Sequence, residues 1–241
     1  MKVSVIVPAF NEERLLAETL DRIRSAMRAF ADRDWQTELI VCDNNSTDRT
    51  PDIAREAGAI VVFEPVNQIA RARNRGAAAA TGDWLVFVDA DSHPGRELFD
   101  DVAGQMTSGR CVAGGSTLRM RGWHPMAWVG TRLWNCVSRC NRLLAGSFIF
   151  CEAVAFRAVG GFSQELFVGE ELDLSKRLHL HARTSSRQIV ILHRHPMLTS
   201  DRKMKLYSAR EHLRFLFRVA FNFSGTMTDR EACHQWYDGR R

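Results

Sequence analysis

The sequence predicts an α/β fold in which a mostly parallel sheet carries helices on both faces. Short apolar runs alternate with amphipathic stretches along the first half of the chain, which is typical of strands joined by right-handed helical crossovers. The runs VSVIV, ELIVC and WLVFV are almost continuously apolar, as expected of strands that are buried on both sides.

The elements of the first half can be assigned in order. Apolar side chains recur at helical spacing after the first strand, at Leu16, Leu20, Ile23 and Met27. A polar turn over 43–48 precedes a short helix that ends near 57. We expect strands at 3–8, 38–42, 59–63 and 84–88, and helices at 12–30 and 68–81.

The second half is less regular. We expect strands at 111–118, 147–153 and 188–192, and helices at 123–144, 171–181 and 203–221. No repeat, low-complexity tract or proline-rich linker marks a boundary. We therefore expect one domain over 1–241, in which a second part is built onto the same sheet.

Composition excludes several classes of protein. The chain has 241 residues, of which 45% are hydrophobic and 25% charged, so it is neither disordered nor too small to bury a core. Its net charge of +5 suits an anionic substrate but does not by itself indicate nucleic acid, and we expect no nucleic-acid partner. Six cysteines show no metal-ligand spacing, and the N-terminus lacks a signal-peptide pattern, so we expect a cytoplasmic protein with reduced thiols.

Polar side chains follow three of the predicted strands. Ligands of open α/β sheets bind at the carboxyl ends of the strands, where this chain carries Asn11–Glu13, Asp43–Asp48 and Asp89–Ser92. Asp89 and Asp91 repel each other unless a cation lies near, and carboxylate oxygens suit Mg²⁺ or Mn²⁺. Helix capping for these two aspartates, and a simple Asx-rich turn for 43–48, are the alternatives.

No glycine-rich phosphate loop is present, because neither GxGxxG nor GxxxxGK[ST] occurs. A phosphate-bearing ligand would therefore be met by metal and arginine. The helix at 68–81 offers Arg71, Arg73 and Arg75, of which Arg73 points away from the other two.

These motifs, in this order and spacing, resemble family-2 glycosyltransferases of the GT-A fold. The similarity is carried by VSVIVPAFNEE, DNNSTDRT and ARARNRGAAAATGDWLVFVDADS. It implies a nucleotide-sugar-binding half over about 1–92, an acceptor-side half over about 93–221 and a C-terminal tail over 222–241. It also implies that Asp91 holds a Mn²⁺ or Mg²⁺ ion, and that a larger set binds the nucleotide sugar: Pro8, Ala9, Phe10, Glu12, Asp43, Arg73, Asp89 and Asp91.

The family also carries a Gly-Gly-Phe turn followed by an acidic motif that supplies the catalytic base. Here Gly160-Gly161-Phe162 precedes GEELDLSKR, and Glu171 stands where an aspartate is common. We expect Glu171 to be the base, with Asp173 as its substitute. A helix start with acidic residues in its first turn is the alternative.

The expected reaction moves a sugar from a nucleotide-diphosphate sugar to a hydroxyl acceptor. The metal stabilises charge that develops on the diphosphate while a carboxylate takes the acceptor proton, and a single displacement inverts the anomeric centre. A retaining transferase on the same fold and a non-catalytic nucleotide-sugar-binding protein are the alternatives. UDP is the favoured nucleotide and GDP its rival.

Two further features concern the metal and the acceptor. Some GT-A enzymes use a late histidine as an additional metal ligand, so the resemblance implies that His193 or His195, at alternate positions after a strand, could complete the Asp91 site. His195 is our candidate, and an ordinary surface or core histidine is the alternative. The helices at 123–144 and 203–221 combine arginines with aromatic residues. Such helices suit either a core with a solvated arginine face or a membrane interface. The second case predicts a lipid-linked acceptor and a peripheral site on the inner face of the membrane.

Overall fold

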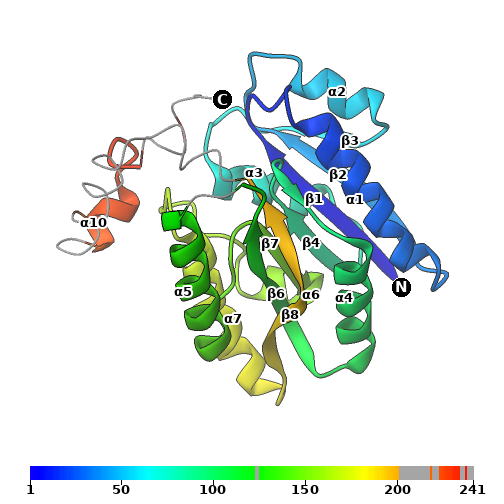
Figure 1. Ribbon diagram of the computed structural model, residues 1–241, viewed down its shortest axis with the longest axis vertical. Coiled ribbons are helices and arrows are strands. Elements are labelled where there is room, and N and C mark those ends of the chain that lie inside the picture. Colours follow the sequence, from blue (N-terminus) through cyan, green and yellow to red (C-terminus); the bar gives the residue numbers. More distant parts are fainter. Residues whose placement is uncertain (123–124, 201–217, 219–222, 234–236, 238–241) are drawn as a thin grey trace.

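The computed structural model describes residues 1–122, 125–200, 218, 223–233 and 237 (Figure 1). Eight strands form one sheet in the order β3-β2-β1-β4-β7-β6-β8-β5. Their bounds are β1 (Lys2–Ala9), β2 (Gln36–Asp43), β3 (Ile60–Phe63), β4 (Trp84–Val88), β5 (Ser92–His93), β6 (Cys111–Met120), β7 (Phe148–Glu152) and β8 (Gln188–Thr199). The sheet joins both halves of the described chain.

The sheet is mostly parallel. Strands β1 to β4 are parallel to one another, and β6 is parallel to β8. β7 is antiparallel to both β4 and β6, so β6 runs in the same direction as β4. The carboxyl ends of β1, β2, β4, β6 and β8 therefore meet at one edge of the sheet.

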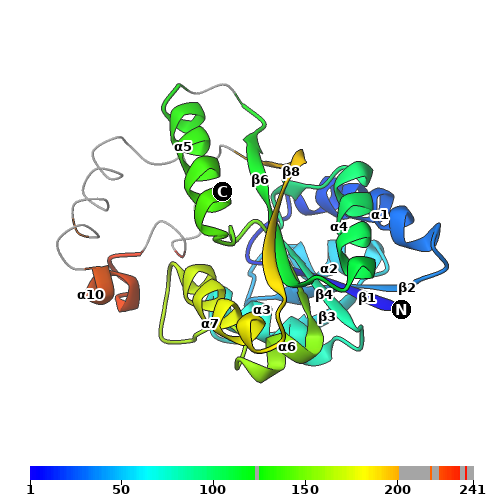
Figure 2. The ribbon, with the colours of Figure 1, turned by 90° about the horizontal axis from the view of Figure 1, so that it is seen from below.

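Helices cover both faces of the sheet, as Figure 2 shows. α1 (Leu16–Ala31) and α4 (Arg96–Ser108) share one core with the sheet, whereas α3 (Ile69–Ala79), α6 (Ala153–Ala158) and α7 (Glu170–Thr184) pack in the other. The remaining described helices are α2 (Thr50–Glu56), α5 (Pro125–Asn141), which packs on β6, and α10 (Phe223–Thr228). The predicted fold class is confirmed.

Most predicted elements are present, with shifted ends. α1 begins at Leu16 rather than at 12, because Glu12 closes a turn in which its carbonyl accepts from the N–H groups of Leu15 and Leu16. The structure adds α4, α6, the two-residue strand β5 and a β8 that continues to Thr199. Apart from Arg218, the helix predicted at 203–221 lies outside the described residues.

α3 lies unusually close to β1. A Cβ added to Gly76 would stand 2.5 Å from Cγ2 of Ile6, which is far inside van der Waals contact. Glycine at this position therefore lets α3 approach the sheet, and this approach fixes where Arg73, one turn earlier, enters the protein interior.

Candidate active site

A cavity of about 400 Å³ opens at the carboxyl edge of β4, β6 and β8. The turn after β4 contributes Asp89 and Asp91, and the start of α7 contributes Glu170 and Glu171. α5 contributes Trp134. The other lining residues come from α3, the strand ends and two loops: Ile69, Arg73, Leu118, Met120, Ala145, Gly146, Ser147, Phe167, Val168, Gly169, Thr199 and Ser200.

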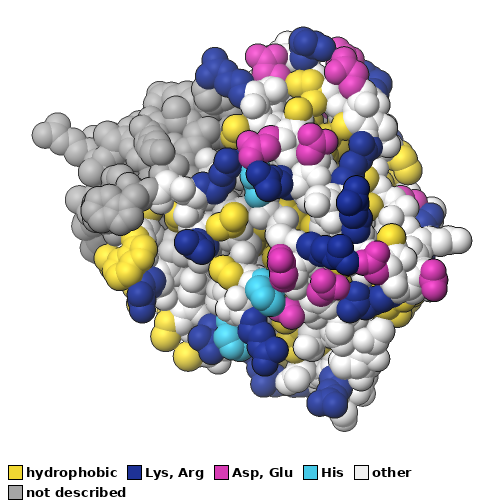
Figure 3. Space-filling model, turned by 45° about the vertical axis from the view of Figure 1, so that its right-hand side comes forward, with side chains coloured by type: hydrophobic (Ala, Val, Ile, Leu, Met, Phe, Trp, Pro, Cys, Tyr) yellow, Lys and Arg dark blue, Asp and Glu magenta, His cyan; other side chains and the backbone are white. Residues whose placement is uncertain are grey.

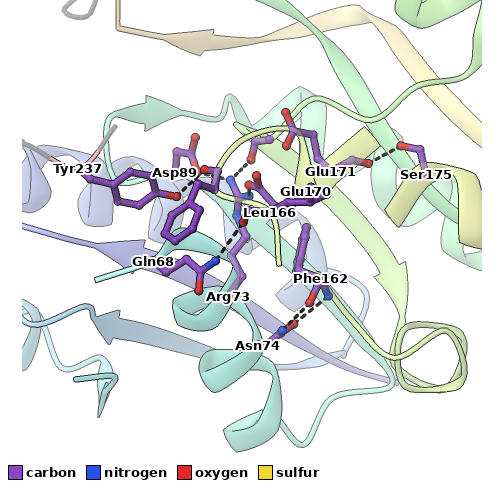
Figure 4. Close-up of polar contacts among 12 residues, drawn as sticks. Gln68, Arg73, Asn74, Asp89, Phe162, Leu166, Glu170, Glu171, Ser175 and Tyr237 are labelled. Atoms are coloured by element: carbon purple, nitrogen blue, oxygen red, sulfur yellow. Dashed lines mark hydrogen bonds and ion pairs between the residues drawn. The ribbon is translucent and has the colours of Figure 1, made fainter. Parts of the chain in front are cut away.

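Arg73 is the buried centre of this site (Figure 4). Its side chain is 1% exposed and donates through Nη1 to Oε1 of Glu170 at 2.5 Å. Nη2 donates to Oδ1 of Asp89 at 2.9 Å and to the carbonyl of Gly146 at 2.9 Å, and the guanidinium lies 5.2 Å from the centre of the Phe162 ring. One arginine thus ties α3 to the β4 turn, to the 145–147 loop and to α7.

The charges around Arg73 decide its ionisation. Burial alone lowers the pKa of Arg73, but the nearby carboxylates of Asp89, Glu170 and Glu171 outweigh burial and raise it. Arg73 is therefore a permanent cation that neutralises part of the acidic cavity. This pairing explains how Asp89 tolerates the neighbouring Asp91. Arg73 Nε is buried and has no hydrogen-bond partner among the residues that the structure describes.

Glu171 lies in the same cavity at the start of α7. Burial and the adjacent Glu170 raise the pKa of Glu171 to about 8, although Arg73 opposes the shift. The helix starts from Gly169, which has a φ of 79° in the left-handed region that favours glycine. In the next turn, the Ser175 hydroxyl donates to the Glu171 carbonyl at 2.7 Å (Figure 4).

Asp173, the predicted substitute for Glu171, faces elsewhere. Its carboxylate accepts from Nε and Nη2 of Arg177 at 2.9 and 2.6 Å, one turn along α7. It does not line the cavity. The prediction that Asp173 can replace Glu171 is therefore wrong, because the i,i+4 ion pair holds it on the helix surface.

Asp91 lies in a turn that follows strand β4. Within this turn, the Ser92 N–H donates to the Asp89 carbonyl at 3.0 Å. The Ser92 hydroxyl donates to Thr199 Oγ1 at 3.0 Å and fixes the turn to β8. Asp89 and Asp91 thereby line the same cavity, as the sequence predicted, although a turn and not strand alternation brings them there.

His195 does not join Asp91. Ser116 of β6 pairs with Leu192 and Leu118 pairs with Met197, so four residues of β8 bulge out opposite the single residue Thr117. The bulge breaks the two-residue alternation. His195 Nδ1 lies 2.9 Å from Oδ2 of Asp101 on α4, outside the cavity. The prediction that His195 is a ligand of the same metal as Asp91 is wrong for this reason.

The predicted nucleoside residues lie along the same edge of the sheet, at the end of β1, in the loop that follows it and at the end of β2, but do not line this cavity. They are Pro8, Ala9, Phe10, Glu12 and Asp43. Hydrogen bonds join the two loops that follow these strands: the Asn44 N–H donates to the Ala9 carbonyl at 2.8 Å, and the Thr47 N–H donates to Asn11 Oδ1 at 2.8 Å. Asp43 is 5% exposed and accepts from the Ser46 N–H at 3.0 Å.

Several lining residues were not found from the sequence. Glu170 carries the strongest missed signal, because it adjoins the motif that was recognised and pairs with the buried Arg73. Gly146 and Ser147 stand in a loop without a chemical motif. Trp134 was noted only as one of the aromatic residues of an amphipathic helix.

The fold is that of GT-A glycosyltransferases. TarS of S. aureus (residues 1–349, in complex with UDP-GlcNAc) superposes with a TM-score of 0.64 at 20% identity, over 98% of this chain and 69% of that chain. The mannosyltransferase PcManGT from Pyrobaculum calidifontis, in complex with GDP-Man and Mn²⁺, gives 0.69 at 19% identity, over 96% and 64% of the two chains.

The family model for glycosyl transferase family 2 matches residues 4–156, more than half of the chain. The chain therefore belongs to glycosyltransferase family 2. A dolichol-phosphate mannosyltransferase of Pyrococcus furiosus is 32% identical over 124 residues, which are 48% of this chain and 33% of that protein. The chain spans 16% to 56% of the length of the curated relatives it matches.

Membrane contact was also expected from the sequence. None of the described helices combines the length and apolar content that crossing a bilayer requires.

Proposed function

We propose that this chain transfers a sugar from a nucleotide-diphosphate sugar to a hydroxyl acceptor, and that the cavity beside Arg73 is where transfer occurs. The observation that carries the proposal is the convergence of Asp89, Asp91 and Glu171 on one cavity at the carboxyl edge of the sheet. UDP is the favoured nucleotide and GDP its rival, since the structural neighbours are complexes with UDP-GlcNAc and GDP-Man.

The charge of the cavity supports a divalent cation. Four carboxylates and one arginine line it, so an anionic diphosphate would meet repulsion there. Mg²⁺ and Mn²⁺ in phosphate-binding sites need only one or two protein carboxylates, and Asp91 is the carboxylate we propose for this role. No group of three or more histidine, cysteine, aspartate or glutamate side chains suited to a metal occurs among the described residues. When bound, Mn²⁺ or Mg²⁺ would stabilise the negative charge of the leaving diphosphate.

Glu171 is proposed as the general base. The acceptor hydroxyl attacks the anomeric carbon, and the Glu171 carboxylate takes its proton as the bond to the diphosphate breaks. A pKa of about 8 makes Glu171 a stronger base than an ordinary glutamate, and lower pH leaves it protonated and inactive. One displacement of this kind inverts the anomeric centre.

Arg73 is proposed as a positioning residue for Asp89 and Glu170. All three of its hydrogen bonds go to protein oxygens, so its guanidinium is already engaged before a nucleotide binds. Pro8, Ala9, Phe10, Glu12 and Asp43 are proposed to line the nucleoside site further along the edge, on the strength of the family resemblance.

The acceptor side of the proposal concerns the membrane. A lipid-linked hydroxyl, a cytoplasmic location and peripheral contact with a membrane follow from the sequence alone. Flotation with anionic liposomes tests the membrane contact: protein that stays wholly in the soluble fraction would contradict it.

Release of nucleoside diphosphate from UDP- and GDP-sugars, with Mn²⁺ present, tests the proposal. We expect turnover with one donor class that Glu171→Gln greatly reduces and the matched variant Asp173→Asn retains. Donor binding without any turnover would favour the non-catalytic alternative. A product with the donor's anomeric configuration would favour the retaining one.

A further inference from the structure

A second cavity, of about 680 Å³, lies on another side of α5. Its described lining residues come from α5, β6 and β8 and are all polar or basic: Thr117, Arg132, Asn135, Cys136, Arg139, Cys140 and His193. None of them is acidic. We call this the basic cavity.

The basic cavity belongs to a long part of the chain without acidic residues. Residues 102–151 include six arginines and not one aspartate or glutamate, although the whole chain has 28 acidic residues. Arg132 and Arg139 are seven positions apart and so lie on one face of α5. Neither forms an ion pair within the part of the chain that the structure describes. In the space-filling view of Figure 3, basic and apolar side chains occupy the lower left, the side on which α5 lies in Figure 1.

The walls of the basic cavity are held in place. Asn135 accepts from the Leu118 N–H and donates to the Leu118 carbonyl, both at 2.9 Å, which joins α5 to β6. The Arg132 guanidinium stacks on the Trp128 ring at 4.8 Å. Stacking orients a guanidinium while leaving the N–H groups at its edge able to donate.

A buried donor also faces this space. Thr117 is 7% exposed, lines the cavity, and its hydroxyl has no hydrogen-bond partner among the described residues. This hydroxyl can therefore donate to a ligand or water in the cavity. The β8 bulge brings His193 to the same cavity.

We propose that the basic cavity binds a phosphate group through Arg132, Arg139, Thr117 and His193. Two guanidinium groups, a hydroxyl and an imidazole are donors that suit a phosphate, and none of the described lining residues is a carboxylate that would compete. The phosphate belongs either to a soluble phosphate compound or to a lipid headgroup, since Val129 and Leu133 on the same helix are 58% and 66% exposed. That this phosphate is part of the acceptor rests on the proposed function, whereas binding itself does not.

Cys136 and Cys140 provide a reporter inside the basic cavity. Both are exposed, whereas the other four cysteines are buried. Burial raises the pKa of Cys42 to about 12 and those of Cys111 and Cys233 to about 11, which keeps these thiols unreactive. A neutral maleimide should therefore label Cys136 and Cys140 first, and a bound phosphate should slow their labelling.

The experiment measures this labelling rate against inorganic phosphate, with sodium chloride at equal ionic strength as the control. We expect inorganic phosphate to protect the two cysteines saturably in the wild-type chain. The Kd for phosphate should rise about tenfold or more in each of the variants Arg132→Gln and Arg139→Gln. The matched charge variants Arg119→Gln and Arg142→Gln, which do not line the cavity, should keep the protection.

Vesicles identify the source of the phosphate. If phosphatidylglycerol vesicles protect the two cysteines from labelling more strongly than inorganic phosphate does, and Leu133→Ser removes the difference, the ligand is a lipid headgroup. If the two sources protect equally and Leu133→Ser has no effect, the ligand is a soluble phosphate. Protection by neutral phosphatidylcholine vesicles alone, protection that survives in the Arg132→Gln/Arg139→Gln double variant, or no protection by either phosphate source would overturn the proposal. None of these readouts depends on sugar transfer.

Discussion

The two cavities on α5 have opposite charge. The candidate active site is lined by four carboxylates and one arginine, whereas the basic cavity is lined by two arginines, a histidine and no carboxylate. An acidic cavity can receive a diphosphate only together with a cation, but a basic cavity can hold a phosphate directly. We therefore expect metal-dependent binding on one side of α5 and metal-independent binding on the other.

The largest effect is expected from a variant that removes the general base of the candidate active site. Glu171→Gln should lower kcat by about 10²–10⁴-fold, because it removes the proton acceptor while keeping the shape of the side chain. Donor affinity should change little, and Asp173→Asn should leave kcat near the wild-type value. Steady-state kinetics measure both constants, and a normal kcat in Glu171→Gln would remove Glu171 from the mechanism.

Asp91→Ala should lower transfer by about 10²–10³-fold, because a leaving diphosphate would lose the charge stabilisation that the cation supplies. Asp101→Asn is the matched control, since Asp101 pairs with His195 outside the cavity. Wild-type activity in Asp91→Ala across a range of Mn²⁺ concentrations would refute the assignment of Asp91.

Arg73→Gln should destabilise the fold by about 3–5 kcal/mol, because it leaves the buried Glu170 without its cation. Arg71→Gln, two residues earlier on α3, removes a more exposed ion pair with Glu64 and should cost at most about 1 kcal/mol. Urea unfolding measures both values. Equal destabilisation of the two variants would show that Arg73 is not the centre of the site.

Stability should also depend on pH through Glu171. Its folded-state pKa of about 8 lies above its ordinary value of 4.5, so the folded chain holds this proton over a range where the unfolded chain has lost it. The contribution of Glu171 to stability is therefore present below pH 4.5 and lost as the pH rises to about 8. Glu171→Gln should gain about 4 kcal/mol relative to wild type at pH 8, because each unit of the pKa shift is worth about 1.4 kcal/mol, and less than about 0.5 kcal/mol at pH 4.5. Unfolding curves at the two pH values check this, and an equal change at both would contradict the raised pKa.

The smallest effect is expected when the arginines of the basic cavity are replaced and donor affinity is measured. Arg132→Gln/Arg139→Gln should leave the Kd for the nucleotide sugar within about twofold, because these arginines do not line the donor cavity. Calorimetric titration with the donor and Mn²⁺ measures it. A large loss of donor affinity would mean that the two cavities act as a single site.

The sequence was most informative where order along the chain is also order in space. The strand expected at 84–88 is β4 with the same ends, and Asp89, Asp91, Arg73 and Glu171 do line one cavity. Each of these residues follows a strand or starts a helix in a recognisable motif. Local spacing in the sequence was sufficient to bring these residues to one site, because the carboxyl ends of parallel strands lie at the same edge of the sheet.

Sequence reasoning failed where contacts between elements that are distant in the chain determine the position of a side chain. Strand alternation predicted that His193 and His195 share a side, but the β8 bulge separates them. Asp173 had the right chemistry, yet its i,i+4 partner Arg177 holds it away from the cavity. Glu170 was overlooked because its role exists only through Arg73, 97 positions away in the chain.

Metal-dependent donor binding at Asp91 is the central claim, and thermal unfolding with nucleotide sugars tests it most directly. A ligand that binds only the folded chain raises the Tm. We expect a UDP- or GDP-sugar to raise the Tm in the presence of Mn²⁺, and expect the shift to disappear with EDTA and in Asp91→Asn. A shift of equal size without any divalent ion, or in Asp91→Asn, would contradict the claim.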